Sequence, residues 1–298
     1  MTQLLLSDVF AGESATTHDD IVNVASVPQR SPFRYPGGKT WLVPRIRQWL
    51  AQRPAKPYKL VEPFAGGAIV GLTAAFENLT ERVTLVELDE QVAAVWQTIL
   101  GGGAQWLARR IFDFDLTTES AREELAKPAT GSSQLAFQTL LRNRINHGGI
   151  LAPGSGILKT GENGKGIHSR WYPATLSKRI LNIASIRHKI TFIHGDGLEV
   201  MQNNAACPDT VFFIDPPYTA GGKKAGSRLY THNELDHAAL FDLAAKLRGD
   251  FLMTYDNDGG VRSLAQEHGF ATREIAMKNT HHAQMTELLV GRDLSWGR

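Results

Sequence analysis

The residues best suited to chemistry are the tetrapeptide Asp215-Pro216-Pro217-Tyr218, which follows the apolar run 211–214. β-Branched and aromatic residues bounded by turn formers predict a buried strand of a parallel sheet, which puts Asp215 at its carboxyl end. Ligands of open α/β sheets bind at that edge, and two prolines fix the backbone there. The Asp215 carboxylate and the Pro216 carbonyl could accept hydrogen bonds from a planar amine, and Tyr218 could stack on a base. The alternative is a strand end followed by a packed Pro-Pro turn.

A second candidate site lies earlier in the chain. Residues 58–61 predict a strand, residues 62–68 a glycine-rich turn, residues 69–76 a helix and residues 83–86 another strand that leads into Glu87. Glycines let a ligand approach the backbone, and an acid about 20 residues further on can accept hydrogen bonds from ribose hydroxyls. The turn lacks the spacing of a dinucleotide fingerprint, which favours a smaller nucleoside cofactor than NAD. A tight turn that needs glycine for structural reasons alone is the alternative.

A second glycine turn, Gly37-Gly38-Lys39, precedes an amphipathic helix through Trp41, Ile46 and Leu50. A lysine after two glycines indicates an anion site only weakly, because the spacing of a phosphate-binding P-loop is missing.

Charge is distributed unevenly along the chain. The net charge is +2, yet residues 142–189 contain nine Lys or Arg and a single acid, Glu162, which leaves an acidic remainder. A basic segment in an acidic protein indicates a polyanionic partner, and a solvated charged face is the alternative. Three residues of this segment, Lys159, Lys165 and Arg170, are therefore candidates for contacts with the phosphates of such a partner.

Composition excludes several classes of protein. The chain has 298 residues, 42% of them hydrophobic, and no apolar run long enough to span a bilayer. Its single cysteine, Cys207, excludes an internal disulfide and a thiolate zinc site, and the histidines lack metal-ligand spacing. We therefore expect a cytoplasmic protein without a metal. Trp96 falls at helical spacing and is expected in the core.

The order of predicted elements gives the domain organisation. Residues 1–29 are polar and are expected to form a flexible arm. Strands and helices alternate in residues 30–100 and 190–298, which predicts an α/β catalytic domain with a Rossmann-like, doubly wound and mostly parallel sheet. Residues 101–189 begin with three glycines, contain mainly helical stretches and a basic glycine-rich loop, and are predicted to be an insertion for target recognition.

Four motifs in this order resemble one known family. They are Arg34-Tyr35-Pro36-Gly37-Gly38-Lys39, Glu62-Pro63-Phe64-Ala65-Gly66-Gly67, Gly195-Asp196 and Asp215-Pro216-Pro217-Tyr218. The chain is similar to the Dam-like DNA adenine-N6 methyltransferases, whose cofactor is S-adenosylmethionine. The resemblance runs from about Pro32 to Gly291.

The resemblance implies a role for each matching residue. The catalytic residues would be Asp215, Pro216, Pro217 and Tyr218. The cofactor-binding residues would be Tyr35, Lys39, Phe64, Gly66, Gly67, Glu87 and Asp196, with Tyr35 and Lys39 at the methionine end. The DNA contacts of such enzymes would correspond to Arg142, Asn143, Arg144 and Asn146.

The expected reaction is methylation of the N6 amine of an adenine flipped out of duplex DNA. An RNA adenine methyltransferase and a DNA-binding module without turnover stay open as alternatives. A cytosine-N4 methyltransferase would use a similar tetrapeptide, but that family usually begins it with serine. The expected partner is double-stranded DNA, with a cognate restriction nuclease or another defence-system component as a further candidate.

Overall fold

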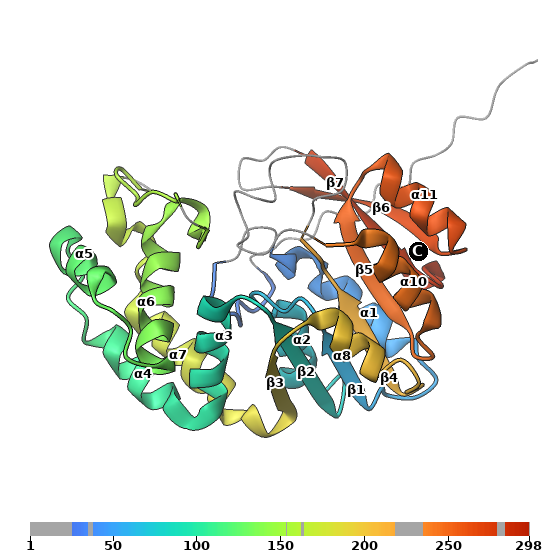
Figure 1. Cartoon of the computed structure of the whole chain (residues 1–298), viewed down its shortest axis with the longest axis horizontal. Helices are drawn as coiled ribbons and strands as arrows, with labels where there is room; N and C mark the ends of the chain where they lie inside the picture. Colours follow the sequence, from blue (N-terminus) through green and yellow to red (C-terminus); the bar gives the residue numbers. More distant parts are fainter. Residues whose placement is uncertain are drawn as a thin grey trace, which may run out of the picture.

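The computed structural model describes residues 26–34, 38–152, 154–161, 164–217, 235–278 and 284–297. These residues form one seven-stranded sheet in the order β3-β2-β1-β4-β5-β7-β6 (Figure 1). Its strands are β1 (Lys59–Glu62), β2 (Arg82–Glu87), β3 (Ile190–His194), β4 (Thr210–Ile214), β5 (Phe251–Asp256), β6 (Ala271–Lys278) and β7 (Gln284–Gly291). Strands β1 to β5 are parallel, and β7 inserts antiparallel between β5 and β6. The predicted mostly parallel sheet is confirmed.

The strand order changes direction between β1 and β4. From β1 the chain moves outward through β2 to β3, and then returns to β4 on the other side of β1. At such a switch point the connections that follow the two adjacent strands lead in opposite directions, so a crevice forms outside the carboxyl ends of the strands. Glu62 ends β1 there, and Asp215 directly follows β4.

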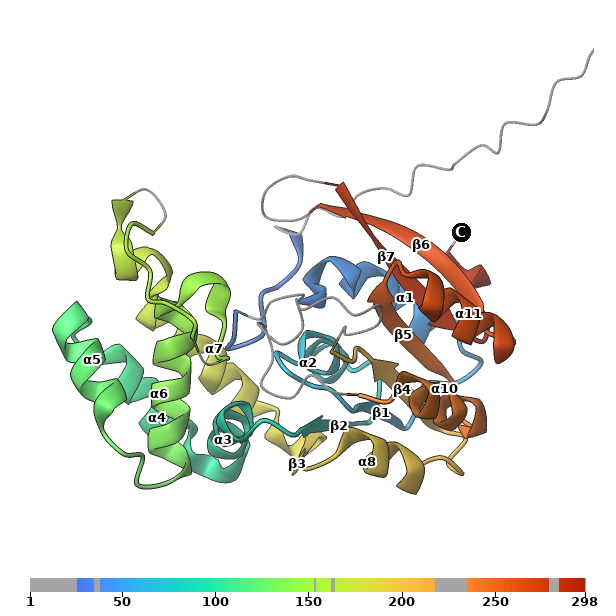
Figure 2. The same ribbon diagram turned by 45° about the horizontal axis from the view of Figure 1, so that its top comes forward.

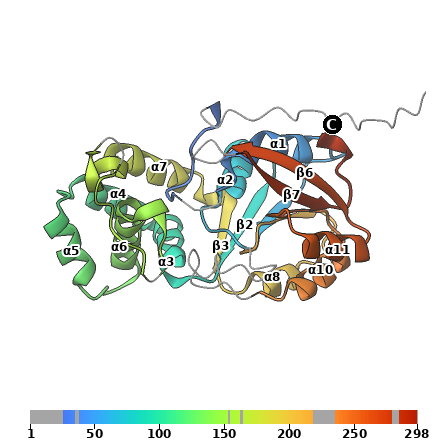
Figure 3. The same ribbon diagram turned by 90° about the horizontal axis from the view of Figure 1, so that it is seen from above.

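Helices cover both faces of the sheet, because strand residues alternate between the faces. Leu60 belongs to the apolar core under α1 (Val43–Ala51) and α2 (Ile69–Phe76). Val61 belongs to the core on the opposite face. The helices of that face are α8 (Gly197–Asn203), α10 (His237–Lys246) and α11 (Gly259–Glu267), as Figure 3 shows. This doubly wound arrangement is the predicted fold class.

A helical lobe lies beyond the β3 edge of the sheet (Figure 2). It consists of α4 (Ala104–Phe112), α5 (Thr118–Ala126), α6 (Ser132–Ile145) and α7 (Pro173–Ser185). Helix α3 (Glu90–Thr98) packs on α6, and α4 packs on α7. Phe137 and Ile180 of the lobe belong to the same apolar core as Leu60, so the lobe and the sheet share one core.

The glycine run at 101–103 does not interrupt the helices as strongly as the sequence indicates. Helix α3 continues through a π-helical turn, Ile99–Gly103, directly into α4, and only Gly102 leaves helical geometry, with φ +103°. Glycine tolerates this left-handed conformation, so the run bends the helical path into the lobe. Of the predicted arm, residues 1–25 lie outside the described residues. Within the described ranges, no helix is both long and apolar enough to cross a membrane.

Candidate active site at the carboxyl edge of the sheet

Asp215 leaves a strand whose five residues are all buried, and its side chain is 24% exposed. The parallel pairing of Ile214 with Met253 brings it beside Thr254 of β5. Thr254 donates its hydroxyl hydrogen bond to Asp215 Oδ1 at 2.8 Å, and Lys39 Nζ lies 3.0 Å from the same oxygen. These two contacts orient the carboxylate at the switch point. Pro216 is buried behind it, whereas Tyr218 lies outside the described residues.

Lys39 lies between two carboxylates. Its side chain is 3% exposed, and Nζ is also 3.5 Å from Glu287 Oε2 on β7. Burial raises the pKa of Glu287 to about 7, although the Lys39 charge opposes that rise. The sequence indicated a contact with the cofactor for Lys39 and gave no role to Glu287 or Thr254. In the structure Lys39 joins Asp215 to the closing strand of the sheet.

Glu62 brings a further buried carboxyl group to this edge. One of its oxygens accepts a hydrogen bond from the Gly71 amide of α2 at 2.7 Å. Burial raises the pKa of Glu62 well above its ordinary value, and the negative charge of Asp215 adds to the rise. A methyl carbon added at Gly71 would lie 2.6 Å from Leu85 Cδ2 and 2.7 Å from Glu62 Oε2, so these two side chains would have to shift.

Glu87 organises the glycine turn at the end of β2. Its carboxylate accepts three backbone hydrogen bonds of 2.9 Å, from the amides of Gly66, Leu88 and Asp89. Burial raises the pKa of Glu87 to about 7, and the three amides oppose that rise. A carboxylate offers about four acceptor positions, so a ribose hydroxyl could still donate to it. The residues at this turn therefore fit a nucleoside cofactor. Phe64 and Gly67 are half-buried in the same turn.

Trp96 holds the same turn from the side of α3. Its indole Nε1 donates a hydrogen bond to the Gly66 carbonyl at 3.0 Å, and the ring is fully buried. Gly66, with φ +45°, is thus fixed through both its amide and its carbonyl. The core position expected for Trp96 is confirmed, but its hydrogen bond to Gly66 was not predicted from the sequence. The only available signal is that a buried indole N–H needs an acceptor.

We expect Trp96→Phe to weaken the binding of S-adenosylmethionine about two- to twelvefold, because the variant keeps most of the packing but loses one hydrogen bond of about 0.5–1.5 kcal/mol. Calorimetric titration measures the change. Trp49→Phe is the control, since the Trp49 indole donates to Asp250, directly before β5, and not to the glycine turn. Equal affinities in the two variants would show that the turn does not depend on the indole.

Asp196 follows β3 and is exposed, and its carboxylate accepts a hydrogen bond from the Leu198 amide at 2.7 Å. It therefore caps α8. The Gly195 amide donates to the Glu87 carbonyl at 3.1 Å, which brings the ends of β3 and β2 together. Asp196 thus reaches the edge of the sheet where the family places the cofactor. Tyr35 lies outside the described residues.

Three of the expected DNA contacts are not at the surface. Asn143, Arg144 and Asn146 are 1%, 6% and 6% exposed, and their side chains hydrogen-bond to backbone groups. Burial lowers the pKa of Arg144 to about 10. Arg142 contacts the side chain of Gln91 on α3. The burial of Asn143, Arg144 and Asn146 leaves little of these side chains accessible for the DNA contacts that the resemblance implied.

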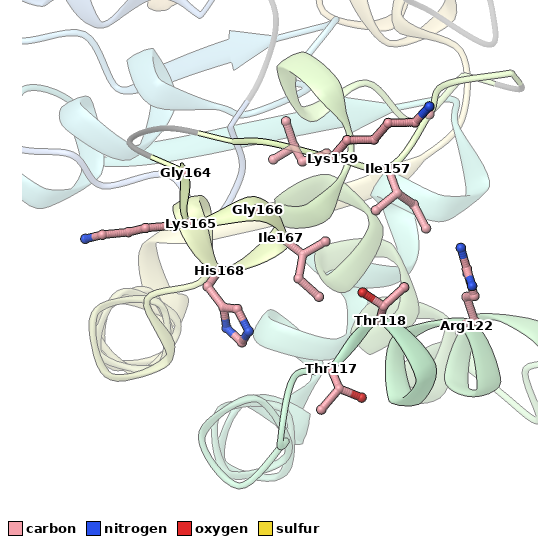
Figure 4. A pocket seen from close by; sticks show the side chains of 12 residues that line it. Thr117, Thr118, Arg122, Ile157, Lys159, Gly164, Lys165, Gly166, Ile167 and His168 are labelled. Atoms are coloured by element: carbon pink, nitrogen blue, oxygen red, sulfur yellow. The ribbon is translucent and has the colours of Figure 1, made fainter.

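Lys159 and Lys165 lie at a cavity of about 710 Å³ in the helical lobe (Figure 4). Ile157 and Ile167 contribute an apolar lining, and the two lysines extend on opposite sides. Other lining residues are Thr117, Thr118, Arg122, Leu158 and His168. The sequence did not single out Arg122, which stands among acids on α5. Arg170 follows the cavity in the chain, and partial burial lowers its pKa.

Comparison with known proteins agrees with the methyltransferase motifs. Residues 35–126 match the model of the D12 class N6 adenine-specific DNA methyltransferases. The Dam-like resemblance is confirmed. This match includes the Lys39 turn, the glycine turn and Glu87, whereas Asp215 and the basic segment lie beyond it.

Solved structures with a similar chain path include two RNA methyltransferases, both at low identity. An rRNA methyltransferase from Streptomyces viridochromogenes is 13% identical with a TM-score of 0.43, over 94% of this chain and 97% of that one. A tRNA methyltransferase of B. subtilis is 10% identical with a TM-score of 0.36, over 83% of this chain and 64% of that one. No curated protein matches the chain by sequence.

Proposed function

We propose that this chain is an S-adenosylmethionine-dependent methyltransferase that acts on the N6 amine of adenine in duplex DNA. The observation that carries the proposal is the Asp215 carboxylate at the switch point, oriented by Thr254 and Lys39 in a chain that matches the D12 class. S-adenosylmethionine supplies an electrophilic methyl group. Glu87 and the turn at Gly66 would hold its nucleoside part, since they offer acceptors and close backbone approach.

The amine determines what the protein must do. The lone pair of adenine N6 is delocalised into the ring, so the nitrogen is a poor nucleophile until it moves towards tetrahedral geometry. The Asp215 carboxylate and the Pro216 carbonyl can each accept a hydrogen bond from one N–H group of the amine, and so hold the nitrogen on that path. Positive charge develops on the nitrogen during transfer, and a preoriented carboxylate stabilises that charge. We assign this role to Asp215.

Duplex DNA as the substrate is supported by the D12 match and by the basic segment. A base inside a duplex must leave the stack before it can reach Asp215, at a cost of a few kcal/mol. Stacking on Tyr218 would recover about 1–3 kcal/mol. The lobe beyond β3, with Lys159 and Lys165, would supply the positive surface for the phosphates.

The test is to incubate the purified chain with labelled S-adenosylmethionine and either duplex DNA or single-stranded RNA. We expect N6-methyladenine in the duplex DNA, identified by mass spectrometry of the nucleosides. Methylation of RNA alone would favour the RNA adenine methyltransferase. DNA binding without any transfer would identify a binding module, and N4-methylcytosine would exclude adenine as the target.

The two lysines at the cavity in the lobe lead to a separate prediction about the salt dependence of DNA binding. If Lys159 and Lys165 contact phosphates, log affinity for DNA falls with log salt at a slope of about −0.9 per contact. Reversing both charges in Lys159→Glu/Lys165→Glu should therefore flatten the slope by about 1–2. Fluorescence anisotropy with labelled duplex at several salt concentrations measures it.

The matched control is Lys246→Glu/Arg248→Glu, which changes the net charge equally on the exposed end of α10, away from the lobe. We expect its salt slope to stay near that of the unmodified chain. Identical slopes in the two double variants would mean that the cavity lysines form a solvated face and that DNA binds elsewhere.

A further inference from the structure

Residues 31–34, termed the lead-in segment, precede Gly37-Gly38-Lys39 in the chain. One side chain of the helical lobe binds both backbone groups of Arg34. The amide of Asn143 on α6 accepts a hydrogen bond from Arg34 N at 2.9 Å and donates one to Arg34 O at 2.9 Å. It also donates to the Gly149 carbonyl at 2.7 Å. Asn143 is 1% exposed, so this pairing is shielded from water.

Two arginines of the lobe bind the preceding carbonyls. Arg144 of α6 donates to the Pro32 carbonyl, and Arg179 of α7 donates to the Ser31 carbonyl at 3.3 Å. Burial lowers the pKa of Arg144, and the nearby charge of Arg179 lowers it further. Among the described residues neither arginine forms an ion pair with a carboxylate. Their guanidinium groups instead donate hydrogen bonds to carbonyls of the lead-in segment.

The lead-in segment also lies against Trp96 of α3. Phe33 is 5% exposed, and its ring centroid lies 5.9 Å from that of Trp96, whose indole binds Gly66. The segment therefore contacts α6 and α7 of the lobe and also the indole that holds the glycine turn.

The distance from the lead-in segment to Lys39 is limited by the chain. Four backbone steps from Arg34 to Gly38 span at most about 14 Å. The fixed position of Arg34 therefore restricts where Lys39 can lie. Lys39 in turn must come within 3.0 Å of Asp215.

We propose that Asn143 is a positioning residue, which holds the lead-in segment against the helical lobe and thereby keeps Lys39 at Asp215. Its effect on turnover rests on the proposed function. Asn143 then supports the active site from within the protein, whereas the resemblance implied that it contacts DNA.

Two substitutions disturb the lead-in segment from different sides. Asn143→Ala removes both hydrogen bonds to Arg34. Gly149→Ala adds a methyl group that would collide with the Arg34 carbonyl oxygen, at a position with φ +76°. Gly148→Ala is the matched control, because its φ is +65° but its added carbon would meet only Ile150, at 3.5 Å. The control has the same type of backbone strain without the contact to Arg34.

The first measurement is amide hydrogen exchange, which needs no turnover. We expect exchange in the lead-in segment to be at least tenfold faster in Asn143→Ala and Gly149→Ala than in Gly148→Ala, while β4 keeps its protection in all three. β4 also reports whether each variant is folded, and either folded variant is sufficient for the test. An unchanged exchange rate in the lead-in segment would overturn the proposal.

The second measurement is methyl transfer to duplex DNA. We expect kcat to fall at least tenfold in Asn143→Ala and Gly149→Ala, with KM for DNA within threefold of the control. A rise in KM for DNA with unchanged kcat would restore the DNA contact for Asn143 and overturn the proposal. If the unmodified chain transfers no methyl group, the proposed function fails, and the exchange rates still test the position of the lead-in segment.

Discussion

Replacing Asp215 by alanine should reduce methyl transfer by about 10²–10³-fold or more, with S-adenosylmethionine affinity changed only a few-fold. The loss follows from the role assigned to Asp215, which accepts a hydrogen bond from the target amine and stabilises the charge that develops there. Glu87 and the turn at Gly66, which we propose for the nucleoside part of the cofactor, lie at the ends of β2 and β1 and stay intact, so the change in affinity is small. A tritiated-methyl assay measures transfer, and calorimetry measures binding.

The fold should survive this substitution. Asp215 is 24% exposed, and without it Lys39 still has Glu287 as a partner. Removing the Asp215 charge also removes one cause of the raised pKa of Glu287. Asp209→Ala is the control, because this exposed acid precedes β4 at the opposite end of the strand. A variant at Asp215 that keeps half of the activity would contradict the assignment.

The residues at the carboxyl edge of the sheet are well predicted from the sequence, because local sequence patterns indicate where the strands end. Apolar runs bounded by turn formers locate β1, β2 and β4, and the residues that follow such runs lie at one edge of a parallel sheet. Glu87 and Asp215 were found in this way, and their positions at strand ends are confirmed.

Thr254 and Glu287 could not be found in the same way. Thr254 lies inside an apolar run and resembles any core threonine, and Glu287 lies in a closing strand whose partner is not evident from the chain order. Their contacts with the site depend on strand register, with Ile214 beside Met253 and Glu287 opposite Asp256. Register across strands distant in sequence is set by tertiary packing.

The basic run at the end of α6 was misleading for a geometrical reason. Adjacent helical residues point about 100° apart, so Arg142, Asn143 and Arg144 cannot all face one ligand. The structure turns Asn143 and Arg144 towards the lead-in segment. Charge count alone does not separate a polar side chain that binds backbone inside the protein from one that binds phosphate outside it.

Replacing Lys39 by methionine should destabilise the protein by about 3–5 kcal/mol at pH 8 and by about 1 kcal/mol less at pH 5, because the Glu287 pKa of about 7 confines the extra loss to the last pH unit. Removing one partner of a buried ion pair leaves the other charge uncompensated, which accounts for the size of the loss. The folded-state pKa of Glu287, about 7, is above its ordinary value, so the folded protein binds this proton more tightly than the unfolded chain. Stability from this group therefore falls as pH rises from about 4.5 through 7.

Without Lys39 the pKa of Glu287 should rise further, because the lysine charge is what opposes the effect of burial. The difference in unfolding free energy between the variant and the unmodified chain should thus widen from pH 5 to pH 8, as urea denaturation would measure. Glu62, the other buried carboxyl group near Asp215, is present in both proteins and largely cancels in the difference.

The double variant Lys39→Met/Glu287→Gln separates the ion pair from simple loss of packing. Neutral glutamine keeps the shape of Glu287 and needs no counter-charge, so the double variant should recover part of the stability and lose most of the pH dependence. Glu287→Gln alone completes the double-mutant cycle. A destabilisation by Lys39→Met that is equal at pH 5 and pH 8 would mean that Glu287 is not the group that Lys39 compensates, and Asp215 would then be its principal partner.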